Sequence, residues 1–239
     1  MDTYYSILID GIPEGISVKR IVRGPTWVGA ELSGGEFGIA MYTEGESRPR
    51  IFDSLVGLEA RNAAGAVLSW NFAEASEGMA VINAYYNSQR RLRELSCMAS
   101  YDRPCTRGMD LSGKLVAFIG HLKLPPESTA AAKEVYIIER EPKPGDYPDS
   151  ACEYILPRCD VVIISGSAAI NKTMPRLLSL SENAETIIIG PSVPMCPELR
   201  KLGISRLSGM AVSDVDGLVE WMQSERGNPY RFGDTFFIG

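Results

Sequence analysis

Hydroxyl, amide, imidazole and carboxylate groups follow four short hydrophobic runs in the second half of this 239-residue sequence. The runs are rich in β-branched residues and span Leu115–Gly120, Val135–Arg140, Val161–Ser167 and Thr186–Ser192. Such runs are typical of parallel strands that are buried on both faces, and sheets of this kind bind ligands at the carboxyl ends of their strands. We therefore expect the functional site on the turns that end these runs.

The first two turns carry an imidazole and a carboxylate. Gly120 and His121 end the first run and Glu139 ends the second, and we predict that all three contact a ligand. His121 and Glu139 are also the candidates for general acid–base catalysis. An acidic residue at this spacing is typical of dinucleotide-binding folds, but the glycine fingerprint of those folds is absent, which argues against NAD. A surface ion pair of Glu139 with Arg140 or Lys143 is the alternative interpretation.

The third turn carries the largest set of hydrogen-bonding groups. Two hydroxyls, a flexible glycine, an amide and a further hydroxyl suit an anion or a polar small molecule. The predicted contacts are Ser165, Gly166, Ser167, Asn171 and Thr173. Asn171 or Thr173 can alternatively cap the following helix, and capping and ligand contact can coexist.

The fourth turn is stiffened by three prolines between Gly190 and Pro197. Gly190, Pro191 and Ser192 are the predicted ligand contacts. Cys196 lies near a helix start, where the helix dipole can lower the pKa of a thiol. An inert, half-buried thiol is the alternative.

Metal ligands other than oxygen are scarce. Five cysteines without a CxxC pair argue against a disulfide framework and a structural zinc site. His121 is the single histidine, so a site built on several imidazoles cannot form within one chain. Cys159 and Cys196 are the candidate ligands for a soft metal ion, whereas the carboxylates, hydroxyls and amides favour a hard cation.

The first hundred residues predict a small α+β unit. Three alternating runs, Ser17–Val22, Thr26–Leu32 and Glu36–Tyr42, are separated by glycine-containing turns and predict an antiparallel meander. From Ser54 the pattern becomes helical, and a long helix is expected from about Ala73. Strands followed by helices are typical of α+β units.

Three polar residues of this helical stretch are further candidates for ligand contact. Asn71 and Glu74 stand at capping-box spacing, which is the structural alternative. Asn83 is surrounded by alanine, valine and isoleucine. Because a buried amide needs partners, Asn83 either ties down a neighbouring segment or faces a cleft.

Strands and helices alternate in the second half, which predicts right-handed crossovers and a parallel sheet. Helical segments are expected at Ser128–Glu134, Ser150–Leu156, Pro175–Ser181, Pro197–Lys201 and Val215–Ser224, and a fifth strand at Gly203–Leu207. The aperiodic segment 100–113 marks a domain boundary, which gives domains 1–108 and 109–239.

Composition excludes two classes of partner. The net charge of −6 lacks the basic excess of a nucleic-acid-binding protein. The hydrophobic runs are far shorter than the roughly 18–20 residues of a membrane helix, and the N-terminus lacks the basic region of a signal peptide. We expect a cytoplasmic protein, with a homodimer as the commonest assembly of such chains.

Taken together, these segments resemble the family of putative heavy-metal chelation proteins, formerly a domain of unknown function. The resemblance covers nearly the whole chain and rests on Gly38–Ala40, Gly78–Ala84, Ile119–His121, Ile138–Arg140, Leu156–Val162, Ser165–Thr173, Gly190–Ser192 and Leu207–Gly209. It implies an α/β protein in which an enolase-N-terminal-like βββα domain packs on a Rossmann-like domain, with the active site in the cleft between them. Ser165 and Ser167 stand where the family form has threonines, and they preserve the hydroxyls.

The turns and the resemblance lead to one hypothesis and one alternative. The hypothesis is that the interdomain cleft binds a small polar or anionic molecule or a metal chelate. The alternative is a transferase or lyase that acts on a nucleotide-like or cofactor-precursor molecule, with His121 and Glu139 as acid and base. A pair of Ser167 or Ser192 with His121 is a weaker idea, because the GxSxG signature of hydrolases is missing. The sequence leaves the ligand, the metal and the existence of any reaction open.

Overall fold

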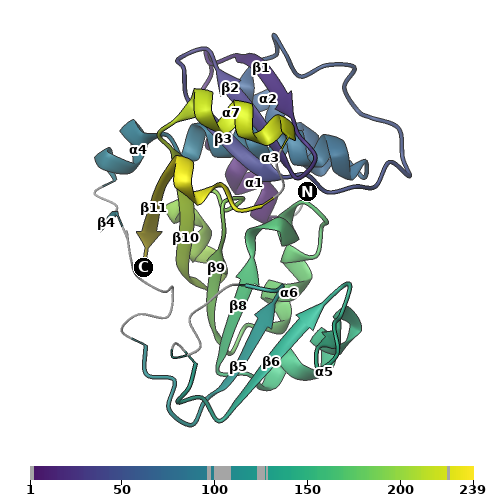
Figure 1. Ribbon diagram of the computed structural model, residues 1–239, viewed down its shortest axis with the longest axis vertical. Coiled ribbons are helices and arrows are strands. Elements are labelled where there is room, and N and C mark those ends of the chain that lie inside the picture. Colours follow the sequence, from purple (N-terminus) through teal and green to yellow (C-terminus); the bar gives the residue numbers. More distant parts are fainter. Residues whose placement is uncertain (1–2, 96–97, 100–108, 123–126, 128, 225–226) are drawn as a thin grey trace.

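The computed structural model describes residues 3–95, 98–99, 109–122, 127, 129–224 and 227–239. A three-stranded antiparallel sheet lies at one end of the long axis, and an eight-stranded, mostly parallel sheet extends to the other end (Figure 1). The fold class is α/β, as predicted. Within the described residues, no helix is long and apolar enough to cross a membrane.

The strands are β1 (Val18–Arg23), β2 (Trp27–Leu32), β3 (Phe37–Met41), β4 (Met98–Ala99), β5 (Leu115–Ile119), β6 (Glu134–Glu139), β7 (Tyr147–Pro148), β8 (Val161–Ser165), β9 (Glu185–Ile189), β10 (Ile204–Val212) and β11 (Gly233–Ile238). The α-helices are α1 (Thr3–Asp10), α2 (Ala60–Ala64), α3 (Phe72–Tyr86), α4 (Gln89–Glu94), α5 (Cys152–Ile155), α6 (Met174–Leu180) and α7 (Val215–Ser224). The 3₁₀ segments are η1 (Gly65–Leu68), η3 (Asp149–Ala151), η4 (Leu156–Arg158), η5 (Gly166–Ala169), η6 (Pro197–Leu202) and η7 (Pro229–Phe232).

The smaller sheet is the predicted meander, in the order β1-β2-β3 with antiparallel pairing. The long helix α3 packs across β2 and β3. A Cβ atom added to Gly38 would lie 2.0 Å from the backbone nitrogen of Ala84, so only glycine lets the helix lie this close to β3. The predicted cap is present, since Oδ1 of Asn71 accepts a hydrogen bond from the backbone N–H of Glu74 (3.1 Å).

Helix α2 begins at Ala60, so the prediction of helix from Ser54 onward is wrong for the first six residues. Gly57 has a φ of +87°, which a helix does not contain. The backbone around it instead pairs with the start of β1, because Val18 donates to the carbonyl of Leu58 (2.9 Å) and Gly57 donates to that of Val18 (2.9 Å).

The larger sheet has the order β4-β11-β10-β9-β8-β5-β6-β7. The four predicted buried strands are β5, β6, β8 and β9, and neighbouring members of this set pair in parallel. The predicted fifth strand is longer than expected, because β10 pairs in parallel with β9 and in antiparallel fashion with β11 along its second half. The hydrophobic pattern did not reveal β11.

The helix predicted at Ser128–Glu134 is wrong where the chain is described, and Ser128 itself lies outside the described residues. Residues 129–133 form turns and bends, and β6 already starts at Glu134. Lys133 donates its backbone N–H to the carbonyl of Lys114 (2.9 Å), so this connection is tied to the segment that leads into β5.

The two sheets share buried packing. The hydroxyl of Tyr5 in α1 donates to the carbonyl of Ala169 after β8 (2.7 Å). Helix α7, at its predicted position, packs on β1 and β2, and Trp221 joins Trp27 and Phe37 in one buried cluster (Figure 1). The division into domains 1–108 and 109–239 stays a prediction, since residues 100–108 lie outside the described part of the chain.

Candidate functional site

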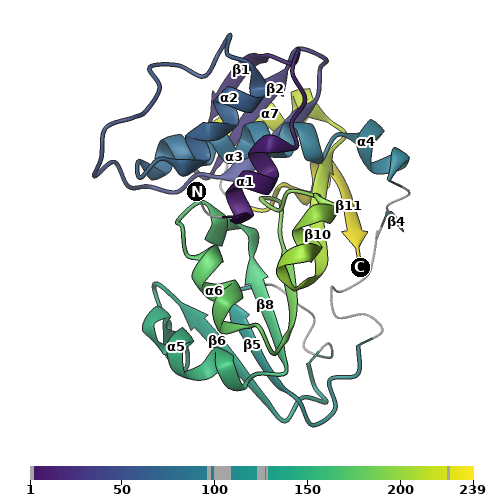
Figure 2. The ribbon, with the colours of Figure 1, turned by 180° about the vertical axis from the view of Figure 1, so that it is seen from behind.

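The carboxyl ends of β5, β6, β8 and β9 lie side by side at one edge of the larger sheet. Ile119 pairs with Ile138 on one side and with Ile164 on the other, and Ser165 pairs with Ile189. In Figures 1 and 2 this edge is directed towards the smaller sheet. The turns singled out in the sequence are therefore neighbours in space.

His121 lies between two carboxylates at this edge. Its Nδ1 is 3.1 Å from Oε1 of Glu139, and its Nε2 is 2.7 Å from Oδ2 of Asp146. The backbone N–H of His121 also donates to Oε1 of Glu139 (2.6 Å). An imidazolium ring has two N–H donors and can donate to both carboxylates at once. Both ring nitrogens thus have carboxylate partners, and no pair of His121 with Ser167 or Ser192 forms within the described residues.

Asp146 is a site residue that the sequence analysis missed. It belongs to the Pro- and Gly-containing connection after β6, which has no periodicity to mark a functional position. Its carboxylate is held by the backbone N–H of Lys143 (2.7 Å), and its side chain is only 8% exposed. The available signal was a turn-forming aspartate close in sequence to Glu139.

A pair of hydroxyls stands next to Gly120. Oγ of Ser165 and Oγ of Ser167 are 2.9 Å apart and hydrogen-bonded to each other. Gly120 has a φ of +107°, and an added Cβ would lie 3.3 Å from Cβ of Ser165. The positive φ favours glycine here, and a Cβ atom would also press on Ser165. Each hydroxyl keeps further capacity to donate or accept, which is suited to a polar ligand.

Asn171 and Thr173 are bonded to each other. Oδ1 of Asn171 accepts from the backbone N–H (3.2 Å) and from Oγ1 (2.7 Å) of Thr173. Thr173 stands at the N-cap position of α6, but its side chain makes no capping bond. Asn171 is partly exposed and Thr173 is exposed, so both residues are accessible near the sheet edge.

Lys172, between these two residues, is the second site residue that the sequence analysis missed. Its φ of +69° is the only positive value for a residue other than glycine among the described residues. Its Nζ donates to the carbonyls of Ile170 (3.0 Å) and Val67, and lies 5.7 Å and 5.8 Å from the ring centroids of Tyr5 and Phe72. Burial lowers the pKa of this ammonium group to about 8. Lys172 therefore joins the turn after β8 to the helical layer of the first half.

The loop from Gly190 to Pro197 is also held against the first half. Oγ of Ser192, which is 3% exposed, accepts from the backbone N–H of Met41 at the end of β3 (2.8 Å). The side chain of Asn87 donates to the carbonyl of Val193 (2.8 Å) and accepts from the N–H of Met195 (2.9 Å). Ser192 is thus part of a packed joint between the two halves, next to Gly190 and Pro191.

The predicted contacts Asn71, Glu74 and Asn83, in α3 or at its start, make hydrogen bonds within the first half of the chain. Glu74 is fully buried and accepts from the backbone N–H groups of Ile51 and Phe52 (2.8 Å each at the shortest). Asn71 donates to the carbonyl of Arg48 (3.0 Å), and Asn83 donates to that of Ile39 (2.8 Å). Oδ1 of Asn83 is buried without a partner among the described residues. A ligand contact by these three residues stays a prediction, while their observed bonds hold β3 and the segment 48–52.

The two candidate thiols are buried. Burial raises the pKa of Cys159 to about 11 and that of Cys196 to about 12, and the thiol of Cys196 donates to Glu198 (3.1 Å). At neutral pH both thiols therefore stay protonated, and metal ligation by Cys159 or Cys196 stays a prediction. Among the described residues, no group of three His, Cys, Asp or Glu side chains is arranged to hold a metal ion.

Comparisons with known proteins agree with this architecture. The sequence model of the DUF364 family, described as "putative heavy-metal chelation", matches residues 109–232, and that of DUF4213, with the same description, matches residues 5–86. An uncharacterized protein of Methanocaldococcus jannaschii is 27% identical over 157 residues, which span 62% of this chain and 58% of that relative.

Two crystal structures of DUF364 proteins with unknown function have the same fold. The protein from Desulfitobacterium hafniense is 35% identical, with a TM-score of 0.86 over 98% of this chain and 96% of that one. The protein from Pyrococcus horikoshii is 25% identical, with a TM-score of 0.79 over 99% of each chain. The family match over more than half of the residues and the similarity along the whole fold lead to one conclusion: this chain belongs to the DUF364 family.

Proposed function

We propose that this protein binds a small anionic or polar molecule, including the organic part of a metal chelate, at the carboxyl edge of its parallel sheet. The observation that carries the proposal is the placement of Gly120, His121, Ser165 and Ser167 on neighbouring turns of one edge. This edge is directed towards the smaller sheet (Figure 1), so the ligand would lie between the proposed domains 1–108 and 109–239.

The donor types favour an anion over a bare soft cation. The serine hydroxyls and the amide of Asn171 can donate hydrogen bonds, and His121 is held in a fixed orientation by Glu139 and Asp146. Cys159 and Cys196 are withdrawn into the core as neutral thiols. A chelated metal ion would then be recognised through the oxygen atoms of its chelator, which accept these hydrogen bonds.

Titration calorimetry with four probes tests the chemistry of this site. The probes are inorganic phosphate, citrate, the nickel–citrate complex and free Ni²⁺. We expect heat from an oxyanion or from the complex, and a loss of affinity of about tenfold or more in Ser167→Ala, which is about 1.4 kcal/mol. Binding of free Ni²⁺ alone, unaffected by Ser167→Ala, would contradict the proposal.

Ser112→Ala is the matched control for this titration. Ser112 is an exposed serine that precedes β5, so it lies at the amino edge of the same sheet. Removing its hydroxyl makes the same chemical change far from the proposed site. The control should bind every probe with the affinity of the wild-type protein.

Catalysis of the transferase or lyase type is a second candidate function. The observation that favours it is the position of His121 between two carboxylates, since an imidazole with two such partners can pass a proton from one side to the other. Mass spectrometry of a bound molecule before and after incubation tests this candidate. Conversion by the wild-type protein, and binding without conversion by His121→Gln, would support it.

A further inference from the structure

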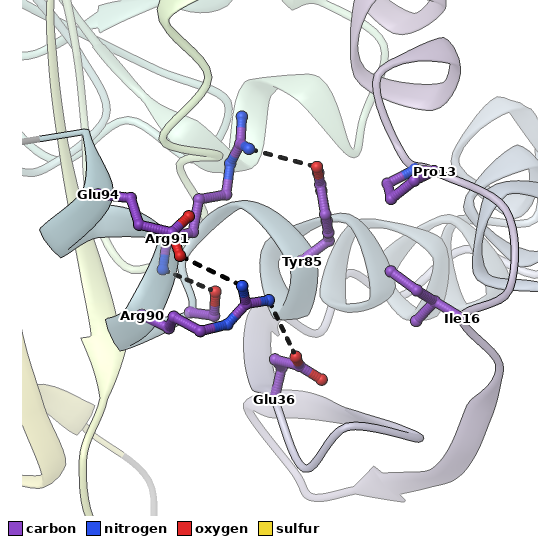
Figure 3. Close-up of a pocket in the computed structure, with 8 residues that line it drawn as sticks. Pro13, Ile16, Glu36, Tyr85, Arg90, Arg91 and Glu94 are labelled. Atoms are coloured by element: carbon purple, nitrogen blue, oxygen red, sulfur yellow. Dashed lines mark hydrogen bonds and ion pairs between the residues drawn. The ribbon is translucent and has the colours of Figure 1, made fainter.

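A separate cavity lies at the other end of β3. It encloses about 240 Å³ between the connection from α1 to β1, the turn from β2 to β3, and the junction of α3 and α4 (Figure 3). Glu36, which lines it, directly precedes β3, whereas Met41 at the end of β3 contacts Ser192. The length of the strand therefore separates this cavity from the carboxyl edge of the larger sheet.

The cavity has an apolar side and a charged side. Pro13 and Ile16 form the apolar side, and Arg90 and Arg91 of α4 lie opposite, with Tyr85 between them (Figure 3). A molecule that fits must therefore present hydrocarbon in one direction and charge in another.

The guanidinium group of Arg91 is held in one orientation. It lies 4.8 Å and 5.1 Å from the ring centroids of Tyr85 and Tyr86, and its Nη1 donates to the hydroxyl of Tyr85 (3.2 Å). Its Nε is buried and has no hydrogen-bond partner among the described residues. This N–H is closed to solvent, so a carboxylate in the cavity would approach the terminal nitrogens of the guanidinium group.

Glu36 presents the complementary group. Its Oε1 lies 3.9 Å from the guanidinium of Arg90, and its side chain is 21% exposed, so a ligand in the cavity can reach this carboxylate. Arg90 also pairs with Glu94 at 3.2 Å, and its side chain is 73% exposed. Ion pairs this exposed are weak, so Arg90 can exchange one carboxylate partner for another at little cost.

We propose that this cavity binds a small zwitterion of the α-amino acid class. Arg90 and Arg91 would receive its carboxylate, Glu36 its ammonium group, and Pro13 and Ile16 its aliphatic side chain. The two arginines and two glutamates that line the cavity sum to zero charge, which matches a neutral molecule with separated charges. The volume of about 240 Å³ has room for a small aliphatic amino acid such as valine, with space left for water.

Calorimetric titration of the full chain with L-valine tests this assignment. Two analogues each remove one charge: 3-methylbutanoate lacks the ammonium group, and 2-methylpropylamine lacks the carboxylate. We expect saturable binding of valine and an affinity weaker by about tenfold or more for both analogues. Absence of valine binding, or equal binding of either analogue, overturns the proposal.

Matched variants locate the binding. Glu36→Gln and Arg90→Gln should each weaken valine binding by about tenfold. Glu14→Gln, on the same connection and with a side chain 88% exposed, and Arg93→Gln, on the same helix, make the same charge changes outside the cavity. Both controls should bind valine as the wild-type protein does. Unchanged binding in Glu36→Gln, with an unchanged circular dichroism spectrum, overturns the assignment to this cavity.

Ser167→Ala separates this cavity from the sheet-edge site. The inference does not rest on the proposed function, because the two sites share no residue. Valine binding should be the same in Ser167→Ala as in the wild-type protein, and a loss there would move the amino acid to the sheet edge and overturn the present assignment.

Discussion

Nε2 of His121 and Oδ2 of Asp146 lie 2.7 Å apart, which joins the turn after β5 to the connection after β6. Asp146 is almost fully covered and also accepts the backbone N–H of Lys143. The contact therefore fixes the histidine and closes one side of the proposed binding edge.

Asp146→Ala should lower the free energy of unfolding by about 1–3 kcal/mol, because it leaves a backbone N–H and an imidazole N–H without their acceptor. Asp110→Ala is the control, since Asp110 also accepts a backbone N–H in a turn but is exposed. Chemical denaturation measures both variants. A double-mutant cycle with His121→Gln should show coupling of at least about 0.5 kcal/mol, and additive effects would mean that the contact contributes nothing.

Gly120→Ala should destabilise the protein more than Gly113→Ala. Both glycines flank β5 and have positive φ angles, but an added Cβ at Gly113 meets nothing within 4 Å, whereas at Gly120 it meets Ser165. We expect a cost of about 1 kcal/mol for Gly113→Ala and about 2–3 kcal/mol for Gly120→Ala. Thermal denaturation compares them, and equal costs would show that Ser165 has room to move.

The strands of this fold were predictable because burial on both faces leaves a clear mark in the sequence. The runs that became β5, β8 and β9 are rich in Val, Leu and Ile, most of which are buried. Strand β11 carries Asp234 and Thr235 among its apolar residues and is only partly buried, so hydrophobicity alone could not distinguish it from a loop. The alanines at 130–132 suggested a helix, but hydrogen bonds to neighbouring segments determine that connection instead.

Only those residues of the candidate site that directly follow a strand could be predicted from the sequence. Gly120, His121, Glu139, Ser165 and Ser167 meet at one edge because parallel strands end together. Asp146 and Lys172 reach the same region through long-range contacts that leave no periodic signal. The capping role of Asn71 was predictable from its spacing to Glu74, but only the fold could show that the amide of Asn83 donates to the carbonyl of Ile39.

Lys172 should make stability depend on pH between 8 and 9. Its pKa is about 8 in the folded chain against an ordinary 10.5. Above pH 8 the folded state has lost a proton that the unfolded state still binds, so the contribution of Lys172 to the free energy of unfolding rises with pH. The rise is at most about 1 kcal/mol over this interval, after a discount for solvent screening.

The comparison with Lys172→Met isolates this contribution. The raised pKa values of Cys159 and Cys196 lower the free energy of unfolding as the pH rises above about 9, which opposes the effect of Lys172. These thiols act equally in both proteins, so their effect cancels in the comparison. Urea denaturation should show that the wild-type protein gains stability relative to Lys172→Met between pH 8 and pH 9. Lys133→Met, at an exposed lysine, is the control and should show no such shift. A parallel pH response in all three proteins would contradict the assignment.

The central claim is that the hydroxyl pair at the sheet edge binds a small anionic or polar molecule. Equilibrium dialysis against the small-molecule fraction of a cell extract, read by mass spectrometry, tests it most directly. We predict that the wild-type protein and Ser112→Ala enrich the same compound and that Ser167→Ala does not. Enrichment of no compound, or equal enrichment by Ser167→Ala, would contradict the claim.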